Sequence, residues 1–188
     1  MKKIVLYGLI TLAGLSSVVV LARQNFVINI TDSLPPGLYS LSSNKTLMRD
    51  NLIVFCPNIS DQTVQYLGVG DPATRFLRRC EQKVVSFTKP IGAVEGDTVK
   101  VTDKSIFING QHAVDFLPNK KLPHVAPGTY TVKPGTVWVI SKYNSLSFDS
   151  RYFGAISVDQ IIGNAKPLWV SHKKEFCYAV SNDYKCIN

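Results

Sequence analysis

Hydrophobic residues in the body of this chain fall in short runs rich in β-branched and aromatic side chains, a pattern typical of β-strands. One run ends at Asn109-Gly110, the strongest short signal for a two-residue hairpin turn. Ten prolines and twelve glycines divide the chain into short pieces, which suits strands and turns better than long helices. We expect strands at residues 51–55, 83–88, 98–101, 105–108 and 136–141.

The segment from Asp61 to Leu67 is the one helix candidate in the body, with Asp61 as its expected N-cap. At 188 residues, with 45% hydrophobic and 18% charged residues, the chain has room for one globular domain and an appendage. The predicted fold is therefore mostly β, with one compact domain at residues 23–170 and a tail at 171–188.

The N-terminus carries a different pattern. Residues 4–22 hold no charge and follow Lys2 and Lys3; as a helix they would span about 29 Å, close to the thickness of a bilayer's hydrocarbon core. The flanking charges favour a cytoplasmic N-terminus. Residues 1–22 are either a retained anchor or a cleaved signal peptide, and the body is exported in both cases. We expect the body in the bacterial periplasm, held at the inner membrane if the anchor remains.

The four cysteines suit an oxidising compartment. No Cys-x-x-Cys pair or histidine cluster accompanies them, which argues against a metal site. Three pairings are possible in principle. We favour Cys56 with Cys80 and Cys177 with Cys186, because each pair falls within one segment.

The net charge of +8 falls by two when Lys2 and Lys3 are set aside. The remaining basic residues are scattered and are not interleaved with aromatic residues as on a nucleic-acid surface. They form a solvated surface or one attracted to anionic lipid headgroups. No nucleic-acid partner is predicted.

A first candidate for chemistry is Ser33, which lies in the Pro/Gly-rich stretch 31–39 shortly after the apolar segment. Serine, proline and glycine are also ordinary turn residues, so Ser33 is either a turn residue or a nucleophile. The three histidines have no evident serine or acid partner, and a Gly-x-Ser-x-Gly motif is absent. A Ser-His-Asp catalytic triad is therefore poorly supported.

Lysine is the remaining general base, and Lys89 ends an apolar run. The nearest acid in sequence, Glu95, is six residues away. A buried lysine without a carboxylate partner has a lowered pKa, and its neutral amine can take a serine proton. The alternative is a lysine that extends from the strand end into water.

A third block runs from Ser147 to Gly154 and holds two serines, an acid and an arginine within five residues. These side chains could form a small hydrogen-bonded lattice that supports an active site. The alternative is a well-satisfied turn in which Asp149 and Arg151 make an ordinary ion pair.

In this order, the three blocks resemble the motifs of the type I signal peptidases, which use a Ser/Lys dyad. The matching residues are Ser33-x-Pro35, Lys89 followed by Gly96-Asp97, and the block 147–154. The form Ser-x-Pro-x-Gly-x-Tyr at 33–39 is similar to the conjugative-transfer branch, the TraF-type peptidases. The similarity covers about residues 25–170 and implies a signal-peptidase-like β domain.

The resemblance also implies roles for individual residues. Ser33 matches the nucleophile and Lys89 the general base. Thr31 matches the position whose hydroxyl, with the Ser33 N–H, binds the oxyanion. The supporting residues are Ser147, which orients the lysine, and Asp149, Ser150 and Arg151, which brace the site. The loop after Lys89 departs from the leader peptidases at Pro90 and Glu95, and the 171–188 tail has no counterpart.

The implied reaction is acyl transfer without a cofactor. TraF-type enzymes cleave, or cleave and cyclise, a pilin precursor, and the sequence leaves hydrolysis and cyclisation open. The expected partners are a pilin or other exported precursor, membrane lipid and conjugative pilus assembly components. The alternatives are a general signal peptidase and a non-catalytic pilus-assembly module. A self-cleaving repressor would carry a helix-turn-helix in place of residues 4–22.

Overall fold

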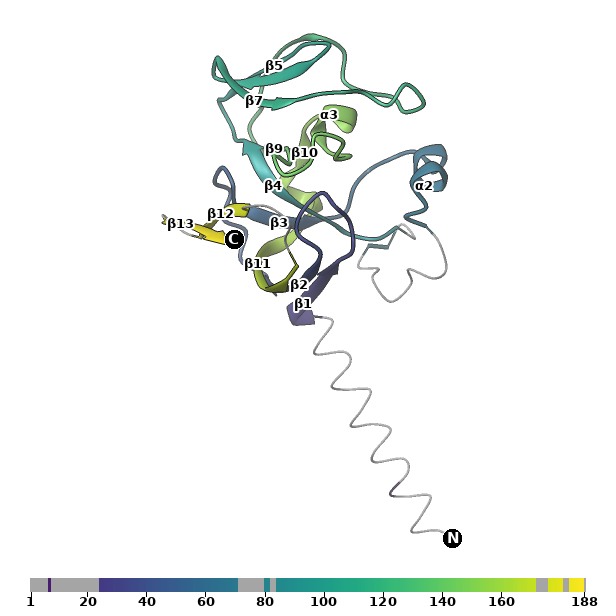
Figure 1. Ribbon diagram of the computed structural model, residues 1–188, viewed down its shortest axis with the longest axis vertical. Coiled ribbons are helices and arrows are strands. Elements are labelled where there is room, and N and C mark those ends of the chain that lie inside the picture. Colours follow the sequence, from purple (N-terminus) through teal and green to yellow (C-terminus); the bar gives the residue numbers. More distant parts are fainter. Residues whose placement is uncertain are drawn as a thin grey trace.

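A computed structural model of the chain describes residues 7, 24–70, 80–81, 84–171, 176–180 and 183–187, the last two ranges as backbone only. Two antiparallel sheets make up the body, and Figure 1 shows the smaller one above the larger. The predicted fold class, mostly β, is confirmed. The predicted membrane segment at 4–22 lies outside the described residues except for Tyr7, and among those described no helix is long and apolar enough to span a bilayer.

The larger sheet has seven strands in the order β1-β2-β11-β3-β4-β9-β10, and all its neighbouring strands run antiparallel. Strand β1 pairs with β2, and the long β11, which comes late in the chain, lies between β2 and β3. The strands are β1 (Phe26–Asn29), β2 (Gly37–Ser42), β3 (Leu52–Phe55), β4 (Phe87–Ala93), β9 (Thr136–Val139), β10 (Ile156–Ser157) and β11 (Ile161–Val170).

Strand β3 lies near the middle of this sheet, and each of its four side chains is buried. Successive side chains of a strand point to opposite faces. Leu52 and Val54 accordingly join one hydrophobic cluster, with Tyr39 among its members, and Ile53 and Phe55 join another. Both faces of the sheet are therefore covered, which explains why β3 is a continuous apolar run rather than an alternating one.

Strand β4 begins later than predicted. The sequence analysis placed a strand at 83–88, with Lys89 at its end. In the structure Pro90 lies inside β4, opposite Leu52, and its carbonyl accepts from Ile140 N–H at 3.0 Å. A register irregularity between Ile91 and Ala93 follows, where β4 passes from β3 to β9. Lys89 is thus an interior strand residue rather than a strand end.

The smaller sheet has the order β7-β6-β5-β8 and is built largely from local connections. The predicted hairpin is confirmed: Asn109 and Gly110 have φ angles of 51° and 81°. A third hydrophobic cluster joins this sheet to Trp138 and Tyr152 from the larger sheet's side. The strands are β5 (Thr98–Val101), β6 (Ser105–Ile108), β7 (Gln111–Asp115) and β8 (Gly128–Thr131).

Short helical segments complete the part of the body that the structure describes. The predicted helix is confirmed as α2 (Asp61–Leu67), but its N-cap is Ser60, whose hydroxyl accepts from Thr63 N–H at 3.3 Å. The sequence prediction of Asp61 was wrong by one residue, and Asp61 lies in the first turn. Further segments are α3 (Ser150–Phe153) and the 3₁₀ helix η2 (Val158–Gln160).

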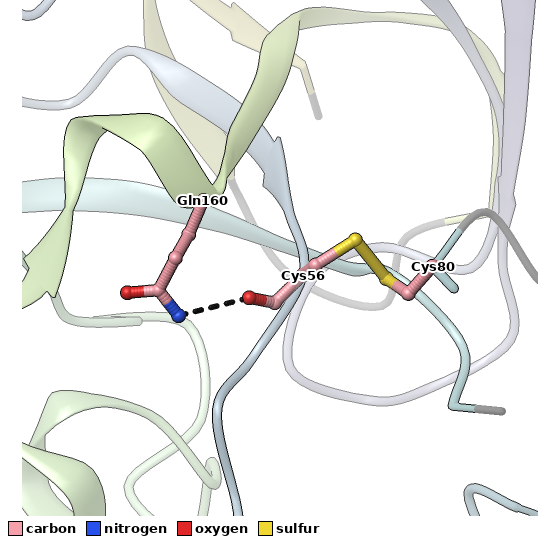
Figure 2. The surroundings of a disulfide bond; sticks show 3 residues. All are labelled: Cys56, Cys80 and Gln160. Atoms are coloured by element: carbon pink, nitrogen blue, oxygen red, sulfur yellow. Dashed lines mark hydrogen bonds between the residues drawn. A yellow bond between two sulfur atoms is a disulfide. The ribbon is translucent and has the colours of Figure 1, made fainter. Parts of the chain in front are cut away.

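A disulfide joins Cys56, at the end of β3, to Cys80 across 24 residues, the first of the two predicted pairs. Gln160 of η2 donates from Nε2 to the Cys56 carbonyl at 3.0 Å (Figure 2). The C-terminal strands β12 (Phe176–Val180) and β13 (Asp183–Ile187) form a separate antiparallel pair in which Cys177 lies opposite Cys186. That register suits the second predicted disulfide, which remains a prediction because the two side chains lie outside the described part.

Asp97 fixes the turn that joins β4 to the smaller sheet. Its carboxylate accepts from Arg49, from Val94 N–H at 2.9 Å and from Asn109 Nδ2 at 2.9 Å. The hydrogen bond from Arg49 is the main cause that lowers the Asp97 pKa from 3.8 to about 2. The stabilisation is therefore present above pH 3.8 and is lost as the pH falls through about 2.

We expect Asp97→Ala to lower the free energy of unfolding at pH 7 by about 2 kcal/mol, because three donors around the turn lose their shared acceptor. Urea unfolding measures this change. Asp103→Ala is the matched control, since Asp103 is exposed in a neighbouring turn. An equal effect of the two substitutions would contradict the bracing role of Asp97.

Candidate active site

Three residues from distant parts of the sequence meet at one point beside the larger sheet. Ser33 lies in the turn between β1 and β2, Lys89 in β4, and Ser147 in the loop between β9 and α3. Lys89 Nζ is 2.8 Å from Ser147 Oγ, and Ser147 Oγ is 3.0 Å from Ser33 Oγ. The three polar atoms therefore form a continuous hydrogen-bonded chain with Ser147 in the middle.

All three side chains are withdrawn from solvent. The exposed fractions are 9% for Ser33, 5% for Lys89 and 2% for Ser147. Burial lowers the pKa of Lys89 from 10.5 to about 8, because desolvation penalises the ammonium form. Asp149 opposes this shift and Arg151 adds to it. At pH 7 about a tenth of the molecules would carry a neutral amine, which can accept a proton.

Asp149 and Arg151 form a fully buried ion pair beneath the site. The guanidinium binds the carboxylate in a bidentate manner, from Nε at 2.8 Å and from Nη2 at 2.7 Å. Its two Nη atoms also donate to backbone carbonyls at 2.7 to 3.4 Å. The four carbonyls belong to Asp115, Ser141, Asn144 and Ser145.

Ser150 and Asp149 connect this ion pair to strand β9. Ser150 Oγ accepts from Val139 N–H at 2.8 Å, and Asp149 Oδ2 accepts from Ser141 N–H at 2.9 Å. Both serine and acid are fully buried. The block that the sequence singled out therefore holds the loop carrying Ser147 against the sheet.

Ser141 reaches the turn that carries Ser33, and sequence reasoning did not identify it. Its hydroxyl donates a short hydrogen bond to the Ser33 carbonyl oxygen. It is the last residue of the predicted strand at 136–141 and looked like an ordinary strand-end polar residue. Only the long-range contact to Ser33 reveals its position.

Asn29 is the second residue that the sequence did not single out. It ends β1 four residues before Ser33, and its side chain contacts the Thr31 hydroxyl and three carbonyls of the following turn. An asparagine next to Thr-Asp-Ser is a weak local signal for a turn. Thr31 itself is exposed at the rim of the site.

Gly37 and Tyr39 explain the end of the Ser33 motif. Gly37 has φ +147°, and a Cβ there would overlap the Trp169 carbonyl of β11. The Tyr39 hydroxyl donates to the Pro35 carbonyl at 2.6 Å, and its ring is fully buried. These contacts hold the C-terminal part of the turn that carries Ser33.

A cavity of about 250 Å³ opens beside Ser33 and Lys89. One wall comes from residues 28–31, a second from residues 85–89, and a third from residues 67–69 after α2. Phe148 also contacts it. The lining is mostly apolar, so the cavity suits a small apolar side chain next to the two polar groups.

No group of three or more potential metal ligands converges in the part of the chain that the structure describes. His112 pairs with Asp115 on the surface at 2.9 Å, and His124 lies against the ring of Phe116. His172 lies outside the described residues. The described histidines do not join Ser33.

Comparison with known families agrees with this geometry. The model for "Signal peptidase, peptidase S26" matches residues 1–170, which include all three blocks. The chain belongs to the signal peptidase S26 family. Membership in this family implies serine peptidase activity on an exported precursor.

Two plasmid transfer proteins TraF of Escherichia coli are each 29% identical to this S26 peptidase. The alignments cover 151 and 152 residues, 75% of this chain, and 81% and 80% of the relatives. The resemblance to TraF-type proteins is thereby confirmed. A crystal structure of a signal peptidase I of Enterococcus faecalis covers 65% of this chain and 98% of its own, with 21% identity and a TM-score of 0.37. That score is too low to support an argument about fold.

We expect the kcat/KM of this S26 peptidase to rise with pH and level off above an apparent pKa near 8. The reason is that raising the pH through this value removes the proton from Lys89 and makes it a base. The measurement is cleavage of a peptide without titratable side chains, between pH 6 and 10. A flat profile, or one that falls with pH, would contradict a lysine base.

Ser147→Ala removes the hydroxyl between Lys89 and Ser33, and we expect kcat per folded molecule to fall about 100-fold, because Lys89 loses its hydrogen-bonded path to Ser33. Ser145→Ala is the control, because Ser145 is exposed in the same loop and only its carbonyl holds Arg151. If Ser147→Ala cleaved as fast as this control, the hydroxyl would have no part in the reaction.

Proposed function

We propose that this S26 peptidase is a membrane-associated serine endopeptidase of the conjugative transfer type, which processes a pilin precursor through a Ser33/Lys89 dyad. The observation that carries the proposal is the hydrogen-bonded chain from Lys89 through Ser147 to Ser33. The conjugative setting is supported by the two TraF relatives, whose names describe plasmid transfer.

In this proposal Ser33 Oγ attacks the carbonyl carbon of the scissile peptide bond. With Lys89 neutral, the hydrogen bonds of the chain reverse, so that Ser33 donates to Ser147 and Ser147 donates to Lys89. The proton thus moves from Ser33 to the lysine as the new C–O bond forms. Ser147 serves as the relay and also holds the lysine in place.

The attack places a negative charge on the carbonyl oxygen. Thr31 Oγ1 and the Ser33 N–H are the proposed donors to this oxyanion, and Thr31 is exposed at the cavity where a substrate would lie. Lys89 then gives its proton to the leaving amine as the C–N bond breaks, which leaves an acyl-enzyme on Ser33. Loss of one such donor typically costs about 3 kcal/mol of transition-state stabilisation.

The acyl group then passes either to water or to the substrate's own amine. Attack by water gives a linear product with a new carboxylate. Attack by the amine closes a new amide bond and gives a cyclic product. The two products differ in mass by one water molecule, which makes them distinguishable.

The membrane setting has support from the surface around β1. Phe26, Ile28 and Ile30 alternate along β1 and its extension with exposed fractions of 38%, 47% and 59%. Trp169, on the nearby β11, is 83% exposed. Large apolar side chains in such number favour an interface with lipid, and we propose that the catalytic domain lies at the periplasmic face of the inner membrane.

The proposal is tested by mass spectrometry of a pilin produced in cells with the wild-type peptidase, Ser33→Ala or Lys89→Ala. We expect a processed pilin with the wild type and the full precursor with either variant. Ser43→Ala and Lys100→Ala are the controls, because both side chains are exposed.

The outcomes separate the candidate functions. Processed pilin in both active-site variants would overturn the Ser/Lys dyad. Unprocessed pilin in the wild type, with unrelated exported precursors trimmed, would replace the pilin peptidase with a general signal peptidase. Unprocessed precursors of every kind in the wild type would leave a non-catalytic assembly module.

A further inference from the structure

Asn29 makes more contacts within the turn around Ser33 than a simple turn residue needs. It is the last residue of β1, with an exposed fraction of 8%. Its Nδ2 donates to the carbonyls of Thr31 at 2.9 Å, Leu34 at 3.0 Å and Pro35 at 3.3 Å. Its Oδ1 accepts from Thr31 N–H at 3.3 Å and from Thr31 Oγ1 at 2.8 Å.

These contacts fix the direction of the Thr31 hydroxyl. Three carbonyl oxygens surround one end of the Asn29 amide, so that end must be the NH₂ group. The other end is therefore the carbonyl oxygen, which can only accept. It follows that the Thr31 hydroxyl donates its single hydrogen to Asn29 in the resting protein.

We infer that Asn29 is a positioning residue for Thr31. Asn29 keeps Thr31 Oγ1 at the site while the hydroxyl hydrogen of Thr31 turns toward the oxyanion. The inference rests on the proposed function, in which Thr31 is an oxyanion donor. A rotation about the Cβ–Oγ bond moves the hydrogen without moving the oxygen. Asn29 Oδ1 still accepts from Thr31 N–H during that rotation, so no buried acceptor is left unpaired.

The same amide links Thr31 to the nucleophile. Leu34 and Pro35 directly follow Ser33, and their carbonyls share Asn29 Nδ2 with the Thr31 carbonyl. A displacement of Thr31 relative to Ser33 would therefore break hydrogen bonds on both sides of the nucleophile. Asn29 holds the two proposed reacting residues at a fixed separation, so that only the hydroxyl hydrogen of Thr31 has to turn when the oxyanion forms.

The test is a double-mutant cycle on the full chain in detergent, with cleavage of a peptide that carries an Ala-x-Ala cleavage sequence. Asn29→Ala is made alone and combined with Thr31→Val or Thr31→Ser. Asn164→Ala is the matched control, because Asn164 Nδ2 also donates to two carbonyls, its Oδ1 accepts from Thr46 N–H, and it does not line the cavity. Thermal unfolding of each variant gives the folded fraction.

We expect Asn29→Ala to lower kcat per folded molecule about 10-fold and to leave KM within about twofold. In the Thr31→Val background the same substitution should lower kcat by less than about threefold, since the hydroxyl that it positions is gone. In the Thr31→Ser background the full effect should return. Asn164→Ala should lower the melting temperature without changing kcat.

An additive cycle, in which Asn29→Ala costs the same with and without the Thr31 hydroxyl, would overturn the inference and leave Asn29 a structural residue. If Asn29→Ala does not fold, Asn29→Asp enters the same cycle and is judged by the same criterion. A wild-type protein that does not cleave the peptide, or that cleaves it after Ser33→Ala, would instead overturn the proposed function.

Discussion

The buried ion pair between Asp149 and Arg151 is the constraint on which the rest of the structure depends. A fully desolvated guanidinium is tolerated only where every donor finds an acceptor, and here the carboxylate and four backbone carbonyls provide them. One of these carbonyls, from Asp115, ends a strand of the smaller sheet, and three belong to the loop before Ser147. The pair therefore ties the smaller sheet and the active-site loop to the same point.

The same ion pair also acts on the pKa of Lys89. The pair carries no net charge. Asp149 raises the pKa of Lys89 and Arg151 lowers it, so desolvation remains the main cause of the lowered pKa. Between pH 8 and 10.5 the folded protein binds fewer protons at Lys89 than the unfolded chain. The free energy of unfolding therefore rises with pH through that window. At neutral pH, keeping Lys89 as a buried ammonium lowers the free energy of unfolding by about 3 kcal/mol. The burial that lowers the pKa of Lys89, and so makes it available as a base, also lowers the stability of the fold.

Local signals in the sequence predicted most of what local physics determines. The Asn109-Gly110 turn, the helix after residue 60 and the apolar run of β3 follow from nearest neighbours along the chain. Lys89 also stood out, because its sequence neighbours are apolar and the nearest acid is six residues away. The contacts of Asn29 are local, but an asparagine near a turn is too common to mark this one. The contact of Ser141 with Ser33 depends instead on how β9 and the turn after β1 are brought together, so no spacing in the sequence reports it. The same reason hid the insertion of β11 between β2 and β3.

The disulfide between Cys56 and Cys80 encloses α2 and residues 67–69, which form one wall of the cavity, whereas Ser33, Lys89 and Ser147 lie outside the closed loop. A crosslink over such a length lowers the entropy of the unfolded chain and so raises the free energy of unfolding by about 3 kcal/mol. Reduction would thus loosen the wall that receives the substrate and leave the reacting atoms in place. The redox state of the surroundings would then act on substrate affinity before it acts on turnover, and a chain that has not yet met an oxidising compartment would be a poor peptidase with an intact catalytic apparatus.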